Sequence, residues 1–318
     1  MSRARSRRGR ANTEREGVEP AFVIETQDLS KHYGERILAV DHLTMGVRRG
    51  EVYGFLGPNG AGKTTTLRML LGLIRPTAGS ALVLESPPGT PQGLARIGAL
   101  VETPAFYPFL SGRDNLRVLA RHAGVPEMRI EAVVEEVDLT ARARDRFATY
   151  SLGMKQRLGV AAALLKDPEL LILDEPMNGM DAAGMAEMRS FIRNLGQNGR
   201  TVLFSSHLMS EVEQVCDRVG VIRSGKLVGE GTLDELRGRA GLRVRAEPLE
   251  LAERVVSAAA EVEHVAIADD GLLIAADPNA AAAINRALVE AGVEVSELRL
   301  ERASLEKVFL ELTQGGED

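Results

Sequence analysis

Short, fully apolar runs alternate with helix-like segments over most of the first 235 residues. Leu170–Leu173 and Thr201–Phe204 have the composition of buried strands, and Ala183–Asn194 between them has the apolar spacing of a helix. Buried strands that alternate with helices are typical of a mainly parallel sheet, because the crossover helices cover its faces. Shorter β-like runs at Phe22–Glu25 and Ala39–Val40 precede this pattern. The chain is therefore predicted to contain an α/β domain.

Two segments depart from this alternation. From residue 104 to about 166 helical patterns dominate, and we expect helices to start at Ser111, after Pro126 and near Ser151. This predicts a helical insert in the α/β domain. Val219–Gly229 contains two apolar runs around a Ser-Gly pair, which favours a β-hairpin with a tight turn.

After about Gly238 the pattern changes to strands and helices in the order βαββαβ, followed by one more helix. This order is typical of a small ferredoxin-like α+β unit. The expected elements are Leu242–Ala246, Leu249–Ala259, Val262–Ala268, Leu272–Ala276, Pro278–Gly292, Val295–Leu300 and Ser304–Leu312. We therefore predict a disordered basic tail over residues 1–20, an α/β domain over 21–238 and an accessory domain over 239–318.

Composition narrows the function. The net charge of −6 argues against a nucleic-acid partner. No apolar run approaches the about 18 residues of a membrane-spanning helix. Met1–Arg10 is basic but is followed by no apolar segment, so we do not expect it to act as a secretory signal. The single cysteine, Cys216, excludes a disulfide framework within the chain.

A glycine-rich loop lies between a predicted strand, Glu51–Gly57, and a predicted helix, Lys63–Ile74. Its pattern is G-x-x-x-x-G-K-[ST], and glycines allow such a backbone to wrap around phosphates. The amides at the helix start face the anion, while the lysine reaches the terminal phosphates and the first threonine can bind Mg²⁺. The predicted ATP-binding residues are Gly57, Pro58, Asn59, Gly60, Ala61, Gly62, Lys63, Thr64 and Thr65.

Two carboxylates follow the apolar run Leu170–Leu173. A buried strand would place Asp174 and Glu175 at its carboxyl end, where α/β sheets bind their ligands. Asp174 is expected to hold Mg²⁺ through its water shell. Glu175 is expected to orient and deprotonate the attacking water. Behind a phosphate loop, this pair predicts nucleotide hydrolysis.

A second helix start has features of a phosphate site. Ser151 is a suitable N-cap, and Gly153 permits close approach of the backbone to a ligand. The simpler interpretation is a capped helix start, and the alternative is a second phosphate-binding terminus. Because the chain already has one phosphate loop, the alternative requires the nucleotide of another subunit and predicts a dimer.

These motifs, in this order, resemble the nucleotide-binding subunit of an ATP-binding cassette (ABC) transporter over roughly residues 22–235. The resemblance implies the P-loop ATPase fold of that family. It also implies that Tyr33 stacks on adenine and that His207 contacts the γ-phosphate as the switch histidine. In trans, Ser151, Leu152, Gly153 and, from the Asn178–Asp181 loop, Asp181 would complete the ATP site of the partner subunit.

The sequence departs from the family pattern at two places. The signature, usually L-S-G-G-Q, has Leu152 and Met154 where Gly and Gln are usual. Glu102 stands where the family has a glutamine. The resemblance implies that this residue contacts ATP and Mg²⁺, and the substitution adds a negative charge there. This substitution and the ending Ala303–Thr313 are similar to the bacitracin- and daunorubicin-type exporters.

The resemblance implies partners and a location. Two ATPase subunits would close on two ATP molecules, and a separate integral membrane permease would hold them at the cytoplasmic face of the membrane. The exposed aromatics Phe106, Tyr107 and Phe109 would bind that permease, or alternatively pack under the insert. The cargo would be a drug, antimicrobial peptide or lipid. The alternative function is a related ATPase that acts on ribosomes or nucleic acid.

Overall fold

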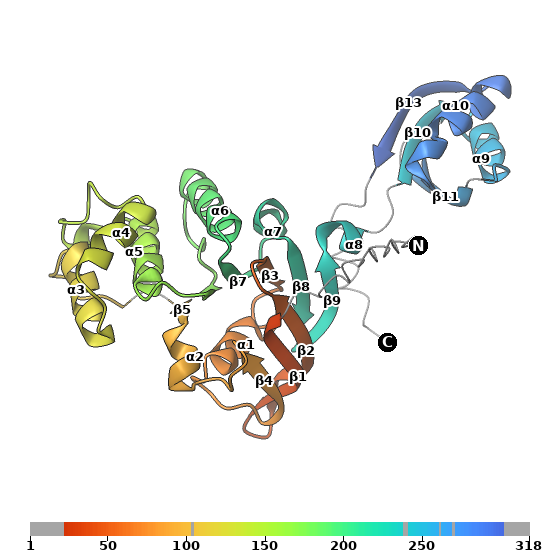
Figure 1. Cartoon of the computed structure of the whole chain (residues 1–318). Helices are drawn as coiled ribbons and strands as arrows, with labels where there is room; N and C mark the ends of the chain where they lie inside the picture. Colours follow the sequence, from red (N-terminus) through yellow and green to blue (C-terminus); the bar gives the residue numbers. More distant parts are fainter. Residues whose placement is uncertain (1–21, 103–104, 238–240, 261, 269–270, 302–318) are drawn as a thin grey trace, which may run out of the picture.

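A six-stranded sheet forms the centre of the first part of the chain (Figure 1). The computed structural model describes residues 22–102, 105–237, 241–260, 262–268 and 271–301. The predicted basic tail over residues 1–20 and the predicted helix Ser304–Leu312 lie outside these residues. The strands, in spatial order, are β5 (Ile97–Leu100), β6 (Leu170–Asp174), β7 (Thr201–Ser206), β3 (Val52–Leu56), β8 (Arg218–Arg223) and β9 (Lys226–Thr232).

The first five of these strands are parallel, and β9 pairs with β8 as the predicted hairpin. Every residue of β3, β6 and β7 is buried, which is why these strands read as continuous apolar runs. The mainly parallel core is thus confirmed. Strand β5 was not predicted, because four residues are too short to show a period. Cys216 is buried under the sheet, and a Cβ added at Gly54 of β3 would lie 2.6 Å from its sulfur.

A second, antiparallel sheet has the order β2-β1-β4. Strands β1 (Phe22–Tyr33) and β2 (Ile37–Arg48) each have 12 residues, far more than the runs predicted from the sequence. The pairing register shifts several times along β1, and each shift interrupts the apolar alternation that would reveal a strand. Strand β4 (Ala78–Val83) completes this sheet.

Helix α1 (Lys63–Leu70) is shorter than the predicted Lys63–Ile74. Gly72 ends it with φ +70°, and a Cβ there would lie 2.4 Å from the Cα of Gly89, so the backbones touch. The other helices of this part outside the insert are α2 (Pro91–Ala95), α6 (Ala182–Gln197), α7 (Met209–Val215) and α8 (Leu233–Arg237).

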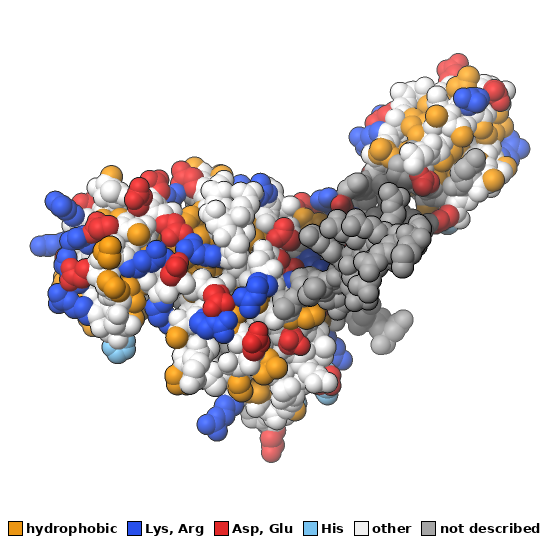
Figure 2. Space-filling view, in the orientation of Figure 1, with side chains coloured by type: hydrophobic (Ala, Val, Ile, Leu, Met, Phe, Trp, Pro, Cys, Tyr) orange, Lys and Arg blue, Asp and Glu red, His pale blue; other side chains and the backbone are white. Residues whose placement is uncertain are grey.

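The helical insert contains α3 (Gly112–Ala123), α4 (Met128–Glu136) and α5 (Leu152–Leu164). Ser111 caps α3 and Ser151 caps α5, each with its hydroxyl oxygen accepting from a backbone amide, as the sequence predicted. On the face shown in Figure 2, basic and acidic side chains are interspersed over the insert. None of the helices in the described ranges is both long and apolar enough to cross a membrane.

The last described unit has the predicted order βαββαβ. Its elements are β10 (Gly241–Glu247), α9 (Leu249–Ser257), β11 (Val262–Ala268), β12 (Gly271–Ala276), α10 (Ala281–Glu290) and β13 (Glu294–Glu301). The antiparallel order β11-β12-β10-β13 is that of a ferredoxin-like fold, which confirms this part of the fold class. The unit has its own apolar core, including Leu242, Val244, Ile274 and Leu288.

Ion pairs join residues that lie just before strands β3, β5 and β6. Glu169 accepts hydrogen bonds from Arg96, at 2.5 Å and 2.9 Å, and from Arg49, at 3.0 Å. The hydrogen bond from Arg96, followed by that from Arg49, lowers the pKa of Glu169 from 4.5 to about 2. Glu169 therefore stabilises the folded state above pH 4.5, and this stabilisation is lost as the pH falls toward about 2.

We expect Glu169→Gln to lower the free energy of unfolding at pH 7 by up to about 1 kcal/mol, since the pair is partly exposed to solvent. Denaturant unfolding of both proteins at pH 7 and pH 3 measures the effect, which should be smaller at pH 3. The control Glu290→Gln removes an exposed carboxylate from α10. A Glu169→Gln effect that stays constant or grows at pH 3 would contradict the assignment.

Candidate functional site

The predicted phosphate loop connects β3 to α1, as the sequence indicated. Gly62 precedes α1 with φ +108°, and a Cβ there would lie 2.4 Å from the carbonyl oxygen of Ala39. A Cβ at Gly57 would lie 2.4 Å from the carbonyl oxygen of Ile222. Both glycines are therefore needed for the close approach of the loop to neighbouring backbone. Pro58, Asn59 and Gly60 are exposed, so this part of the loop is open to a ligand.

Lys63 is almost fully buried at the base of the loop. Its Nζ donates to the carbonyl oxygens of Gly57 and Pro58, at 2.7 Å and 3.2 Å. It also lies 3.2 Å from Oε1 of Glu175. A buried ammonium group held by two carbonyls and a carboxylate is positioned to contact an anion inside the loop.

Thr64 and Asp174 come together at the carboxyl ends of the strands. The Thr64 hydroxyl donates to Oδ2 of Asp174 at 2.8 Å, and Ser205 donates to the other carboxylate oxygen at 2.5 Å. Mg²⁺ prefers such oxygen ligands and usually takes only one or two carboxylates, with phosphates and water completing its shell. Asp174 and Thr64 thus fit a Mg²⁺ ion bound together with a nucleotide.

Glu175 lies between the loop lysine and the predicted switch histidine. While Oε1 faces Lys63, Oε2 lies 2.7 Å from Nδ1 of His207. The residue has φ +46°, and its amide donates to the Ser205 hydroxyl at 2.9 Å. Ser205 therefore orients both Asp174 and Glu175. Sequence reasoning had not singled it out, although it directly follows the apolar run Thr201–Phe204.

The residues expected to act in trans gather elsewhere. Ser151, Leu152, Gly153 and Asp181 line an open pocket of about 500 Å³ with residues of the insert and of α6. A Cβ added at Gly153 would meet no atom within 4 Å, so the start of α5 is accessible. Asp181 caps α6 by accepting from the amide of Gly184 at 2.8 Å. The structure thus divides the predicted site residues into two groups.

Leu152, the departure from the usual signature, contacts the loop that follows Glu175. A Cβ added at Gly179, which has φ +74°, would lie 2.6 Å from a terminal carbon of Leu152. The signature and the Asn178–Asp181 loop therefore touch within one chain. No local pattern indicates this contact, because Leu152 and Gly179 lie on separate segments of the chain.

Two predicted ATP contacts lie outside both groups. Tyr33 is 40% exposed at the end of β1 and pairs across the hairpin with Ile37, two residues before Ala39. The Lys31 ammonium group lies 5.4 Å from the centre of the ring, and the stacking of Tyr33 on adenine remains a prediction. Glu102, with φ +68°, forms an ion pair with Arg68 of α1. Its roles at ATP and Mg²⁺ remain predictions.

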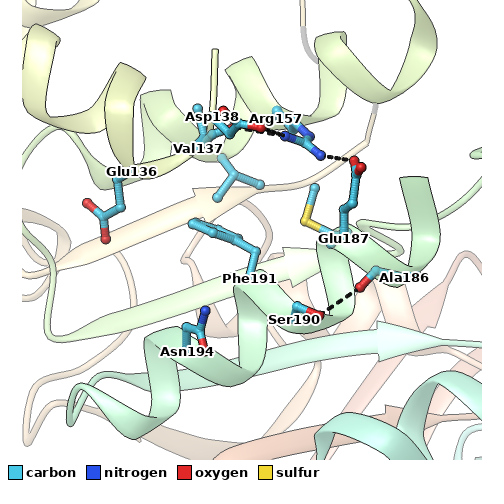
Figure 3. Close-up of a pocket in the computed structure, with 11 residues that line it drawn as sticks. Glu136, Val137, Asp138, Arg157, Ala186, Glu187, Ser190, Phe191 and Asn194 are labelled. Carbon is cyan, nitrogen blue, oxygen red and sulfur yellow. Dashed lines mark hydrogen bonds and ion pairs between the residues drawn. The ribbon is translucent and has the colours of Figure 1, made fainter. Parts of the chain in front are cut away.

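A second pocket, of about 420 Å³, lies between the insert and α6 (Figure 3). Val137, Val160 and Phe191 form much of its apolar lining, and Arg157 of α5 forms ion pairs with Asp138 and Glu187 at its rim. The pair with Glu187 links the insert to α6, whereas the pair with Asp138 lies within the insert. The pocket contains none of the phosphate-loop residues, so we assign it a place in the packing of the insert rather than in the chemistry.

Comparison with known proteins identifies the family. The profile of the ABC transporter family matches residues 40–178. A bacitracin transport ATP-binding protein of Bacillus licheniformis is 41% identical over 92% of this chain and 98% of its own length. A lantibiotic transport ATP-binding protein of Streptococcus pyogenes is 40% identical over 67% of this chain and 92% of its own length. A solved ATP-binding subunit of an ABC transporter has a TM-score of 0.61 and 29% identity, and the match covers 68% of this chain and 92% of that one.

The chain belongs to the ATP-binding proteins of ABC transporters. It is an ATP-hydrolysing enzyme, which confirms the predictions of the family, of the ATPase activity and of nucleotide binding.

Proposed function

We propose that two copies of this chain bind two ATP–Mg²⁺ at composite sites and power the export of an antimicrobial peptide through a separate membrane permease. The permease holds the subunits at the cytoplasmic face of the membrane. Residues 21–238 act as the ATPase domain and residues 239–318 as an accessory domain. The alternative of a ribosome- or nucleic-acid-associated ATPase is not favoured, since transport proteins match nearly the full chain.

The observation that carries the composite site is the separation of the two groups of residues. Lys63, Glu175 and His207 converge by direct contacts. Ser151 and Gly153 line a different pocket of the same chain. A helix start with exposed amides attracts phosphate, so the signature of one copy can contact the γ-phosphate held by the loop of another. Two ATP molecules then join two chains.

The chemistry follows from the contacts around Glu175. When a nucleotide occupies the loop, Lys63 contacts its β- and γ-phosphates, and the Glu175 carboxylate is free to accept a proton from water. His207, which lies at the other carboxylate oxygen of Glu175 from Lys63, contacts the γ-phosphate. Asp174 and Thr64 would hold Mg²⁺, which would neutralise phosphate charge. Tyr33 stacks on adenine, and Asp181 contacts the partner subunit.

The peptide cargo is supported by the names of the relatives, which transport bacitracin and a lantibiotic. The permease contact is supported by two exposed aromatic side chains at the edge of the insert. Tyr107 is 53% and Phe109 68% exposed, and their rings lie 5.8 Å apart. Phe106 instead packs edge-on against Phe147 of the insert. Exposed aromatic pairs of this kind are frequent anchors at protein interfaces.

We expect Phe109→Asp to weaken co-purification with the membrane permease at least about tenfold, because a charge replaces an aromatic anchor. Bacitracin and nisin resistance of cells that express both proteins should fall with it, while ATP hydrolysis by the purified chain stays unchanged. Met128→Asp is the control, since Met128 is 81% exposed on α4 of the same insert. Unchanged co-purification and resistance for Phe109→Asp would contradict the proposed surface. If deletion of the wild-type gene lowers neither bacitracin nor nisin resistance, the proposed peptide cargo is contradicted.

A further inference from the structure

A closed ring of hydrogen bonds surrounds the turn that carries His207. The amide of Leu208 donates to the hydroxyl oxygen of Ser206 at 2.9 Å, so the residues on either side of the histidine are joined. The Ser206 hydroxyl donates in turn to the carboxylate of Glu211. The amide of Glu211, in the first turn of α7, donates back to the carbonyl oxygen of Leu208 at 3.3 Å.

The carboxylate of Glu211 is buried. Only 5% of its surface is exposed, and burial raises the pKa of its side chain. Burial of a carboxylate without a hydrogen-bond partner costs free energy, because the group loses its hydration. The hydrogen bond from Ser206 compensates for part of this cost. Val212, the next residue, is fully buried beside Gly54 of β3 and fixes the helix that carries Glu211.

The same turn contacts the phosphate loop. The carbonyl oxygen of Ser206 accepts from the amide of Gly57, the first residue of the loop, at 3.2 Å. His207 itself lies 2.7 Å from Glu175. Ser206 therefore connects three features: the phosphate loop through its carbonyl, the histidine turn through its hydroxyl oxygen, and Glu211 through its hydroxyl proton.

We propose that Glu211 is a positioning residue, which through Ser206 holds the turn of His207 in register with the phosphate loop and Glu175. The inference rests on the proposed role of His207 at the γ-phosphate. Without the carboxylate, the Ser206 hydroxyl would turn toward its more distant acceptor, the carbonyl oxygen of Leu208 at 3.4 Å, and the backbone angles of the turn would change. The imidazole would then move relative to the γ-phosphate, although every group that touches ATP would remain.

The test compares Glu211→Ala, Glu211→Gln and Ser206→Ala in the full chain. We expect Glu211→Ala to lower kcat for ATP hydrolysis by about 10- to 100-fold, the effect of displacing a reacting group by about 1 Å. KM for ATP should change less than about twofold, because the phosphate-loop contacts remain. Glu211→Gln should restore most of the activity, since an amide oxygen can still accept from Ser206.

The matched control is Glu213→Ala, which removes a carboxylate of the same helix that pairs with Arg237 away from the turn. It should leave kcat unchanged. Ser206→Ala should match Glu211→Ala, and the double variant should be no slower than either, because both break one ring. Ser206→Ala also serves if Glu211→Ala does not fold, since it removes only one hydroxyl.

An NMR signal of the His207 ring provides a readout that simple destabilisation would not move. The chain has five histidines, and His207→Ala identifies the signal by its loss. At a temperature where each variant is fully folded, the signal should shift in Glu211→Ala and Ser206→Ala and return in Glu211→Gln. An unmoved signal, or a kcat that Glu211→Ala leaves unchanged, overturns the inference.

His207→Ala separates this inference from the proposed function. If His207→Ala is slow and Glu211→Ala is not, the positioning role is wrong and the role of His207 stands. If His207→Ala hydrolyses ATP at the normal rate, the proposed function of His207 is wrong and the inference is overturned with it.

Discussion

Glu175→Gln should slow ATP hydrolysis by about 10²- to 10⁴-fold, the usual contribution of a positioned general base. An amide cannot accept the proton of the attacking water, yet it fills the same space between Lys63 and His207. ATP binding should therefore persist, and removal of a negative charge near the phosphates should favour it. Phosphate release measures turnover, and light scattering with ATP measures the dimer, which should accumulate because hydrolysis no longer separates it.

Glu169→Gln is a suitable control for this variant. Glu169 directly precedes β6, whereas Glu175 follows its last residue, so the same chemical change is made at opposite ends of one strand. The control should hydrolyse ATP at the wild-type rate. Near-normal turnover by Glu175→Gln would remove Glu175 from the role of general base.

Lys63→Ala and Ser151→Arg should each abolish hydrolysis, whereas their mixture should recover part of it. Lys63→Ala removes the buried cation of the phosphate loop, and Ser151→Arg blocks the accessible start of α5. In a mixed dimer both defects fall in one pocket and the other pocket is intact. Random pairing makes half of the dimers mixed, so about a quarter of the wild-type rate is expected if the two pockets act independently.

The control for the mixture is Met128→Asp combined with Lys63→Ala, because Met128 is exposed on α4 and belongs to neither group of site residues. Here about half of the wild-type rate is expected, because about a quarter of the dimers have two intact pockets and about half have one. If Ser151→Arg alone hydrolyses ATP normally, or if a chain that stays monomeric throughout turnover reaches the full rate, the shared pocket is wrong.

The sequence predicted the parts of the site that depend on local backbone. The phosphate loop needs glycines at fixed spacing, and the carboxyl end of β6 follows from a fully buried strand, so Gly57–Thr65, Asp174 and Glu175 were found directly. The ferredoxin-like unit was found for a similar reason, because its strands have one buried face. The lengths of β1 and β2 were not predicted, since register shifts hide their period.

Contacts between distant segments could not be predicted in the same way. The packing of Leu152 on Gly179 and the ion pair of Glu102 with Arg68 depend on how helices lie on the sheet. The hydrogen bond between Ser206 and Glu211 depends on the direction in which α7 leaves β7. Each involves ordinary residue types whose partners are set by packing, so no local pattern marks them.

The chain carries a single thiol, and the sheet shields it. Cys216 lies under Gly54, and burial raises the pKa of its thiol well above the usual value. Both effects suppress its reaction with maleimide dyes, which attack the thiolate. A cysteine introduced on an exposed face can therefore be labelled selectively in the otherwise unaltered chain, so subunit approach and separation can be followed by fluorescence energy transfer during turnover.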